Sequence, residues 1–184
     1  MGASSIIVVR PTRDPPRWPL AVAVAVAAIV AGAALGTGAP QVLINTTPSE
    51  PPGLYVKTRQ TPATGRIVAF DTPPAAFPYA DRRLAYLHRM PLLKAVAAGP
   101  GDLVCTLNGA LEIDGRVRAP IVQADRDGVV LPHWRACRRL AADEVFVFSG
   151  RVPNSFDSRY FGPVHRTAIR GVFAPLVVLT SGGR

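Results

Sequence analysis

The chain has 184 residues, 48% of them hydrophobic, and a formal net charge of +9. This length has room for one ordinary domain and one additional segment. A basic balance can indicate a nucleic-acid partner, but the arginines are scattered apart from the clusters at 82–83 and 135–139. Because neither an RNA-binding aromatic signature nor a helix-turn-helix pattern accompanies them, we expect no nucleic-acid partner and a solvated basic face near an anionic membrane.

The first predicted element is a membrane-spanning helix. Leu20–Ala39 is an uncharged run dominated by Ala, Val, Leu, Ile and Gly. About 20 apolar residues are long enough to cross the hydrocarbon core of a bilayer as a helix. Arg10, Arg13 and Arg17 precede this run, against one acid, Asp14. This excess of cations favours a cytoplasmic N-terminus and export of the residues after the helix.

A cleaved signal peptide is the alternative for the same segment, because small residues such as Ala31–Gly32–Ala33 fit a cleavage site. On either interpretation the rest of the chain lies outside the cytoplasm. We expect residues 1–19 to form a cytoplasmic tail, residues 20–39 a transmembrane anchor and residues 40–184 one exported domain.

Short strands separated by glycine and proline dominate the exported part, which predicts a mainly β fold with one compact domain. Asn108–Gly109 predicts a hairpin turn. Tyr79–Met90 has the apolar spacing of a helix. The predicted strands are Gln41–Ile44, Gly53–Lys57, Arg66–Phe70, Leu103–Leu107, Ala110–Ile113, Arg116–Ala119, Gly128–Leu131, Glu144–Phe148 and Gly171–Thr180.

Two cysteines, Cys105 and Cys137, lie in the exported part. In an oxidising compartment two lone cysteines commonly pair, and the chain-entropy relation values such a loop at about 3–4 kcal/mol. Their separation excludes a CxxC redox motif, and without convincing histidine partners they make a weak zinc site. We expect a structural disulfide, with two buried free thiols as the alternative.

Lys94 is one of only two lysines and lies among the aliphatic residues of PLLKAVAA. Burial disfavours the ammonium form, so a lysine in such a place can become a neutral amine and act as a general base. The alternative is a lysine whose stem covers apolar surface while its head reaches water.

Ser49 lies in NTTPSEPPGLY, where three prolines restrict the backbone around it. A serine is a weak nucleophile and needs a base to take its proton. An ordinary turn serine is the alternative. Ser49 lies about ten residues after the predicted anchor, which would place a reactive group at the membrane surface.

A third cluster, PNSFDSRYFGP, brings Ser155, Asp157, Ser158 and Arg159 close together in sequence. Asp157 and Arg159 can form a local ion pair, and the serines offer hydroxyl groups. A structural surface loop is the alternative for this segment.

Other hydrolytic and cofactor motifs are missing from the sequence. His88, His133 and His165 are available for a Ser-His-Asp triad, but no serine lies in a GxSxG motif. There is no glycine-rich phosphate loop and no HExxH zinc motif. We therefore expect no cofactor and no metal.

The order of four segments resembles the type I signal peptidase superfamily. After the anchor come TPSEPPGLY, LLKAVAAGPGDLV, NSFDSRYFGPV and IRGVFAPLV, which together span Thr46 to Val177. The segment around Ser49 is most similar to the conjugative-transfer branch, the TraF-type peptidases. The resemblance implies a mainly β catalytic core, a catalytic domain in the periplasm and a single-pass anchor in the inner membrane.

Carried over by this resemblance, Ser49 is the nucleophile and Lys94 its general base. Thr47 takes the place of the family's oxyanion-hole hydroxyl, with the backbone N–H of Ser49 as the second donor. Ser155 matches the serine that hydrogen-bonds the catalytic lysine. The last two catalytic-site residues, Asp157 and Arg159, match an ion pair that supports one wall of the site.

The chain departs from the housekeeping members of the superfamily in two places. Ser149–Gly150–Arg151 stands where they carry GDN, and the span Ala110–Asp143 leaves little room for the second β domain that they often have. Both departures favour a dedicated protein substrate, which the resemblance implies is a pilin-like precursor, cleaved and in some cases cyclised. The alternatives are a general signal peptidase, a non-catalytic assembly factor of the transfer apparatus and, more weakly, a nucleic-acid-binding protein.

Overall fold

The structure, a computed structural model, describes residues 41–179, and they fold mainly as β structure, which confirms the predicted fold class. The predicted cytoplasmic tail and membrane anchor lie outside the described residues. Within residues 41–179 no helix is long and apolar enough to span a membrane. The strands are β1 (Val42–Asn45), β2 (Gly53–Lys57), β3 (Ile67–Phe70), β4 (Leu92–Ala98), β5 (Leu103–Cys105), β6 (Ala110–Ile113), β7 (Arg116–Pro120), β8 (Cys137–Arg139), β9 (Glu144–Val147), β10 (Val164–His165) and β11 (Ile169–Val178).

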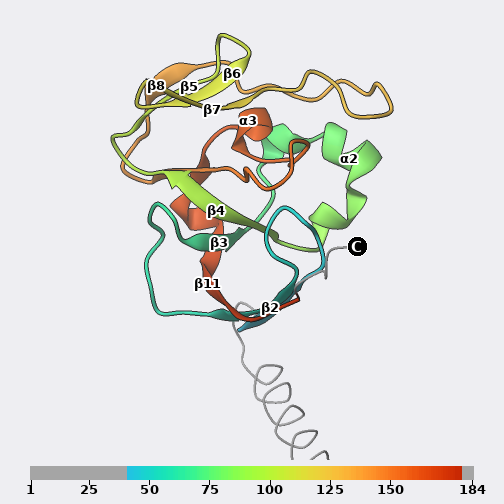
Figure 1. Ribbon diagram of the computed structural model, residues 1–184, viewed down its shortest axis with the longest axis vertical. Coiled ribbons are helices and arrows are strands. Elements are labelled where there is room, and N and C mark those ends of the chain that lie inside the picture. The colour runs from blue at the N-terminus through green and yellow to red at the C-terminus, as the bar shows by residue number, and fades with distance from the viewer. Residues whose placement is uncertain (1–40, 180–184) are drawn as a thin grey trace, which may run out of the picture. The chain divides into compact units, whose positions relative to one another are not determined.

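Seven strands form one antiparallel sheet in the order β1-β2-β11-β3-β4-β9-β10 (Figure 1). The long strand β11 pairs with β2 on one side and with β3 on the other. Along β4, buried residues alternate with half-buried ones, because successive side chains point to opposite faces of a strand. This alternation puts Lys94 on the buried face of β4, together with Leu92 and Val96.

The other four strands form a second sheet in the order β7-β6-β5-β8, which lies beside β4 in Figure 1. The predicted hairpin at Asn108–Gly109 is confirmed, because β5 and β6 pair antiparallel across it. The span 110–143, which was expected to leave little room for a second β domain, supplies β6, β7 and β8 of this sheet, and residues 41–179 belong to one compact unit. The disulfide is formed as predicted: Cys105 on β5 and Cys137 on β8 are opposite each other in register.

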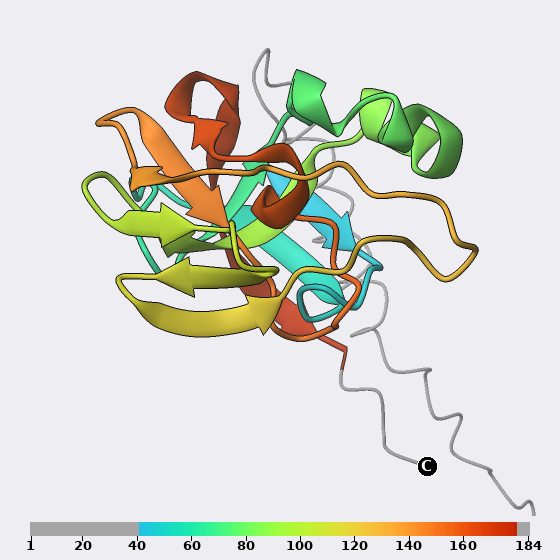
Figure 2. The same cartoon turned by 90° about the horizontal axis from the view of Figure 1, so that it is seen from above.

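Residues 121–136 leave β7 and return to β8 as a long loop on the side of the molecule that carries helix α2 (Tyr79–Arg83), as both views show (Figures 1 and 2). The strand predicted for Gly128–Leu131 is absent from this loop, where only one isolated bridge joins Ala124 to Val130. The physical reason is a local turn. Oδ1 of Asp125 accepts hydrogen bonds from the backbone N–H groups of Asp127 and Val129, both at 2.9 Å, which folds the segment back on itself.

The helix predicted for Tyr79–Met90 is wrong in extent. The structure has α2 and a separate 3-10 turn, η2 (Ala85–His88), divided by Leu84 with φ −139° and ψ 41°. Tyr86 and Met90 are half exposed and line a pocket. Their apolar spacing therefore reflects the wall of that pocket, not a continuous buried helix face.

The main hydrophobic core lies between the large sheet and its helical segments, η1 (Pro74–Ala76) and α3 (Ser158–Phe161). Phe70 and Phe161 pack against each other within it, with ring centroids 6.1 Å apart. A second cluster, around Val104, Leu111 and Phe146, joins the two sheets. These cores fix β4 and β9, the strands that position the candidate active site.

Candidate active site

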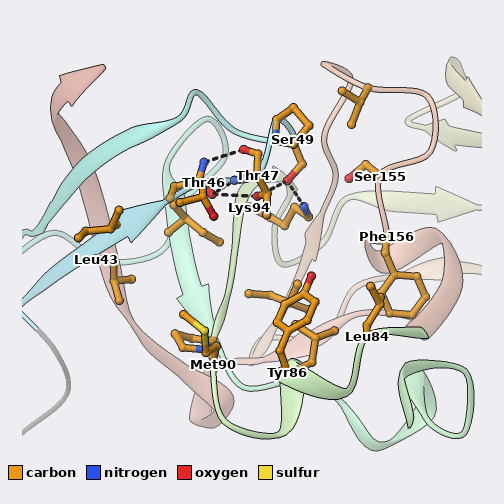
Figure 3. A pocket seen from close by; sticks show the side chains of 18 of the residues that line it. Leu43, Thr46, Thr47, Ser49, Leu84, Tyr86, Met90, Lys94, Ser155 and Phe156 are labelled. Carbon is orange, nitrogen blue, oxygen red and sulfur yellow. Dashed lines mark hydrogen bonds between the residues drawn. The ribbon is translucent and has the colours of Figure 1, made fainter. Parts of the chain in front are cut away.

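A pocket of about 520 Å³ opens where the loop after β1 faces β4. Figure 3 shows Ser49, Thr47 and Lys94 gathered on one side of it, with Tyr86 and Leu84 across from them. A further wall is formed by Val152, Asn154, Ser155 and Phe156. The pocket therefore combines a mostly apolar lining with a small group of polar side chains, which is typical of a binding site.

At the centre of the site, Nζ of Lys94 donates a hydrogen bond to Oγ of Ser49. Both residues are buried, Lys94 with 4% and Ser49 with 6% of its surface exposed. Ser49 comes from the loop between β1 and β2, whereas Lys94 comes from β4, 45 residues later. The structure thus brings the two sequence-predicted residues into direct contact.

The pKa of Lys94 is lowered from 10.5 to about 8, chiefly because burial penalises the ammonium form. The carboxylates of Asp157 and Glu50 act against this fall, and the guanidinium of Arg159 adds to it. An amine with a pKa near 8 is partly neutral at ordinary pH. It can therefore accept a proton from the hydroxyl group that it contacts.

Thr47 lies beside the pair, with its Oγ1 3.4 Å from Oγ of Ser49. Its hydroxyl donates to Oδ1 of Asn45 at 2.8 Å, and its backbone N–H donates to the same oxygen at 3.1 Å. The amide nitrogen of Asn45 donates to the carbonyl oxygens of Thr47, Glu50 and Pro51. One buried side chain at the end of β1 therefore fixes the whole loop that carries Ser49.

Two more side chains hold this loop from the other side. Oγ of Ser149, which follows β9, donates to the backbone carbonyl of Ser49. Oε1 of Glu50 accepts the backbone N–H of Ala95 on β4 at 2.9 Å. Sequence reasoning missed Asn45 and Glu50 and noted Ser149 only as a departure from a motif. The sequence carries only a weak signal for Asn45 and Glu50. Both are polar and lie close to the predicted nucleophile, but no spacing pattern indicates which residues they contact.

The ion pair predicted between Asp157 and Arg159 is present and almost fully buried. Nε and Nη2 of Arg159 donate to the two carboxylate oxygens at 2.8 and 3.0 Å. Arg159 also donates to the carbonyl oxygens of Ser155 and Pro120. Asp157 caps α3 by accepting the backbone N–H of Arg159 at 3.2 Å. This pair therefore fixes the wall from which Ser155 projects.

Ser155 points toward Ser49 and Lys94 in Figure 3, but the hydrogen bond expected between Ser155 and Lys94 is not formed. Its buried hydroxyl has no hydrogen-bond partner among residues 41–179. The hydrogen bond of the Lys94 amine goes to Oγ of Ser49. Within the same residues no group of three or more His, Cys, Asp or Glu side chains is arranged to hold a metal ion.

Comparison with known proteins shows which family this chain belongs to. The profile of the family described as signal peptidase, peptidase S26, matches residues 17–177. A plasmid transfer protein TraF from Escherichia coli is 33% identical over 162 residues, which cover 82% of this chain and 89% of that protein. A conjugal transfer protein TraF from Agrobacterium tumefaciens (strain 15955) is 34% identical over 153 residues, which cover 72% of this chain and 80% of that protein.

Among solved structures, a signal peptidase I from Enterococcus faecalis V583 is similar with a TM-score of 0.40 and 21% sequence identity. The similarity covers 64% of this chain and 100% of that one. The family assignment depends on the sequence matches, which span most of the chain and include the segments of Ser49 and Lys94. The chain belongs to the signal peptidase family, peptidase S26, as a serine peptidase of the TraF type.

Proposed function

We propose that Ser49 is the nucleophile and Lys94 the general base of an endopeptidase that processes an exported precursor protein. The observation that carries this proposal is the hydrogen bond between the two buried side chains. The lowered pKa of Lys94, about 8, supports it, because an ordinary lysine is almost wholly protonated at neutral pH.

The reaction is acyl transfer. Neutral Lys94 takes the proton of Ser49 as Oγ bonds to the scissile carbonyl carbon, and the electron pair of the C=O bond moves onto its oxygen. The backbone N–H of Ser49 and the hydroxyl of Thr47 stabilise this oxyanion. The C–N bond then breaks, and the Lys94 ammonium returns the proton to the departing amine. Water or another amine finally attacks the acyl-enzyme.

Two site residues change partners during this cycle. The Thr47 hydroxyl donates to Asn45 in the resting site, so it must rotate about its C–O bond to reach the oxyanion. Ser155, unpaired among the described residues in the resting site, accepts a hydrogen bond from Lys94 once that side chain becomes an ammonium. Asp157 and Arg159 keep the wall behind Ser155 in position.

The relatives named as plasmid and conjugal transfer proteins support a substrate in conjugative transfer, and we propose a pilin-like precursor, whose ends the amine pathway would join. Residues 20–39 would anchor the enzyme in the inner membrane by a single pass, with the catalytic domain in the periplasm. Retention in the membrane after alkaline carbonate washing tests the anchor. Soluble mature chain beginning near Ala34 would contradict it.

The dyad is tested by monitoring maturation of the co-expressed precursor by mass. Ser49→Ala removes the nucleophile, and Lys94→Arg keeps a positive charge but removes the base, because a guanidinium does not deprotonate in this pH range. Both variants and the double variant should be about equally inactive, since the two residues act as a unit. Lys57→Arg is the control and should process normally.

Full processing by Ser49→Ala or Lys94→Arg would contradict the protease mechanism and leave a non-catalytic assembly factor. Cleavage of unrelated secreted precursors as efficiently as of the pilin-like one would instead indicate a general signal peptidase.

A further inference from the structure

Glu50 is a buried acid that takes no part in the acyl-transfer steps. It comes directly after Ser49, and only 5% of its surface is exposed. A buried carboxyl group is unfavourable unless it is paired or hydrogen-bonded, so its retention in the site calls for a physical reason. Among the described residues, the other charged side chains of this site that are as deeply buried as Glu50 are Lys94 and the Asp157–Arg159 pair.

The position of its hydrogen bond gives the reason. Oε1 of Glu50 accepts the backbone N–H of Ala95, the residue after Lys94 on β4. The bond thus joins the chain neighbour of Ser49 to the chain neighbour of Lys94. The carbonyl of Ala95 accepts the backbone N–H of Phe148, just after β9, whereas the N–H of Ala95 has the Glu50 carboxylate as its acceptor.

We propose that Glu50 is a positioning residue of the dyad: through Ala95 it holds the strand of Lys94 against the loop of Ser49, and it sets part of the charge that Lys94 faces. This inference rests on the proposed Ser49/Lys94 function and adds a residue to it. Glu50 need not touch the substrate to act in this way.

The charges around Lys94 come from two sides. Glu50 lies on the loop between β1 and β2 that carries Ser49, whereas Asp157 and Arg159 lie at the start of α3. The two carboxylates favour the ammonium form and Arg159 disfavours it. Burial raises the pKa of Glu50 overall, although the Ala95 N–H and the charges of Lys94 and Arg151 favour its ionised form.

The neighbouring Tyr55 does not add a charge at neutral pH. Its hydroxyl donates to the carbonyl of Pro51 at 2.7 Å, and burial raises its pKa above the usual value near 10. The carboxylates whose charge favours the ammonium form of Lys94 are therefore Asp157 and Glu50. Removing the charge of Glu50 should lower the pKa of Lys94.

The chain offers a direct measurement, because it contains only two lysines, Lys57 and Lys94. Full-length protein carrying lysine labelled with ¹³C at Cε, purified in detergent, gives two side-chain signals, which Lys57→Arg assigns. Their pH titrations are compared in wild type, Glu50→Gln, Glu50→Ala and the control Glu112→Ala. Glu112 lies on β6 in the second sheet, and its side chain makes no hydrogen bond or ion pair within residues 41–179.

In Glu50→Gln the midpoint of Lys94 should move to lower pH by on the order of one unit, while the Lys57 signal keeps its titration. The amide oxygen of Gln still accepts the Ala95 N–H, so hydrogen exchange at Ala95 should stay slow. Glu50→Ala should show the same direction of shift and, in addition, fast exchange at Ala95. Glu112→Ala should match wild type in both measurements.

A titration midpoint of Lys94 in Glu50→Gln equal to that in wild type would overturn the proposed effect of the Glu50 charge on Lys94. Slow hydrogen exchange at Ala95 in folded Glu50→Ala would overturn the proposal that Glu50 holds β4 through Ala95. These measurements need no substrate. They can therefore fail while Ser49→Ala and Lys94→Arg remain inactive, or succeed while those variants process normally, which separates this inference from the proposed function.

Discussion

Burial of Lys94 should cost stability in a pH-dependent way. Its pKa falls from 10.5 to about 8 on folding, a difference of about 2.5 units, which corresponds to about 3 kcal/mol. Between pH 8 and 10.5 the unfolded chain holds a proton that the folded chain has lost, so stability rises with pH through this window. Below pH 8 the full cost is present.

Lys94→Met removes this cost along with the base. It also removes the hydrogen bond to Ser49, which is worth about 1 kcal/mol, and leaves that hydroxyl poorly paired. We expect the variant to be inactive and yet about 1–2 kcal/mol more stable than wild type at pH 7. Near pH 10.5 the difference should vanish or change sign, because the wild-type amine in the folded state is then neutral and its burial costs little.

The assay is urea unfolding of the full-length protein in detergent at several pH values, monitored by tryptophan fluorescence in a Trp18→Phe background, which leaves Trp134, packed against Phe146, as the reporter. The tyrosines titrate in both proteins and cancel in the difference. Lys57→Met is the matched control for loss of a lysine outside the site. A stability difference between wild type and Lys94→Met that is the same at pH 7 and pH 10 would refute the reasoning.

The lowered pKa of Lys94 also determines how the activity should depend on pH. At pH 7 an amine with a pKa of about 8 is roughly 10% neutral, about 300 times more than one with a pKa of 10.5. The kcat/KM should therefore rise about tenfold between pH 7 and 9. A profile that is flat across this range would contradict Lys94 as the base.

Three further outcomes are expected. Asn45→Ala removes five hydrogen bonds in the nucleophile loop and should lower kcat at least tenfold with a smaller change in KM, as single-turnover processing would measure. Replacing Cys105 and Cys137 by serine should lower the free energy of unfolding by about 3–4 kcal/mol and leave kcat unchanged, because the bridge lies in the second sheet. Asp157→Asn leaves Arg159 buried without its counter-charge and should cost about 3–5 kcal/mol by chemical denaturation, and a variant as stable as wild type would contradict the role given to this pair.

The two residues at the centre of the site could be predicted from the sequence better than the residues that hold them in place. Ser49, amid prolines, and Lys94, a rare lysine among aliphatic residues, were candidates from local sequence, but only the resemblance of four ordered segments to a known family gave them their roles. Alternating burial along β4 explains why a lysine at that position points inward. The strands β1, β2 and β9 were also predicted, whereas β4 was noted only as the aliphatic surroundings of Lys94.

The supporting contacts depend on tertiary structure and leave little trace in local sequence. Ser149 meets the carbonyl of Ser49 across 100 residues of chain. Asn45 looks like an ordinary residue at the end of a strand, and its role appears only when the loop folds back over it. The strand predicted at Gly128–Leu131 failed for a different reason, because the Asp125 side chain turns this segment back on itself.

The buried charges of the site fit the chemistry proposed for it. Lys94, Glu50, Asp157 and Arg159 all have at most 5% of their surface exposed. When Lys94 is neutral, one cation faces two carboxylates. When Lys94 takes the proton of Ser49, two cations face two carboxylates, so the charge created on the base meets charges that are already in place. In the proposed mechanism Glu50 and Asp157 would thus favour the ammonium formed during acylation, in addition to the structural contacts that each makes in the resting site.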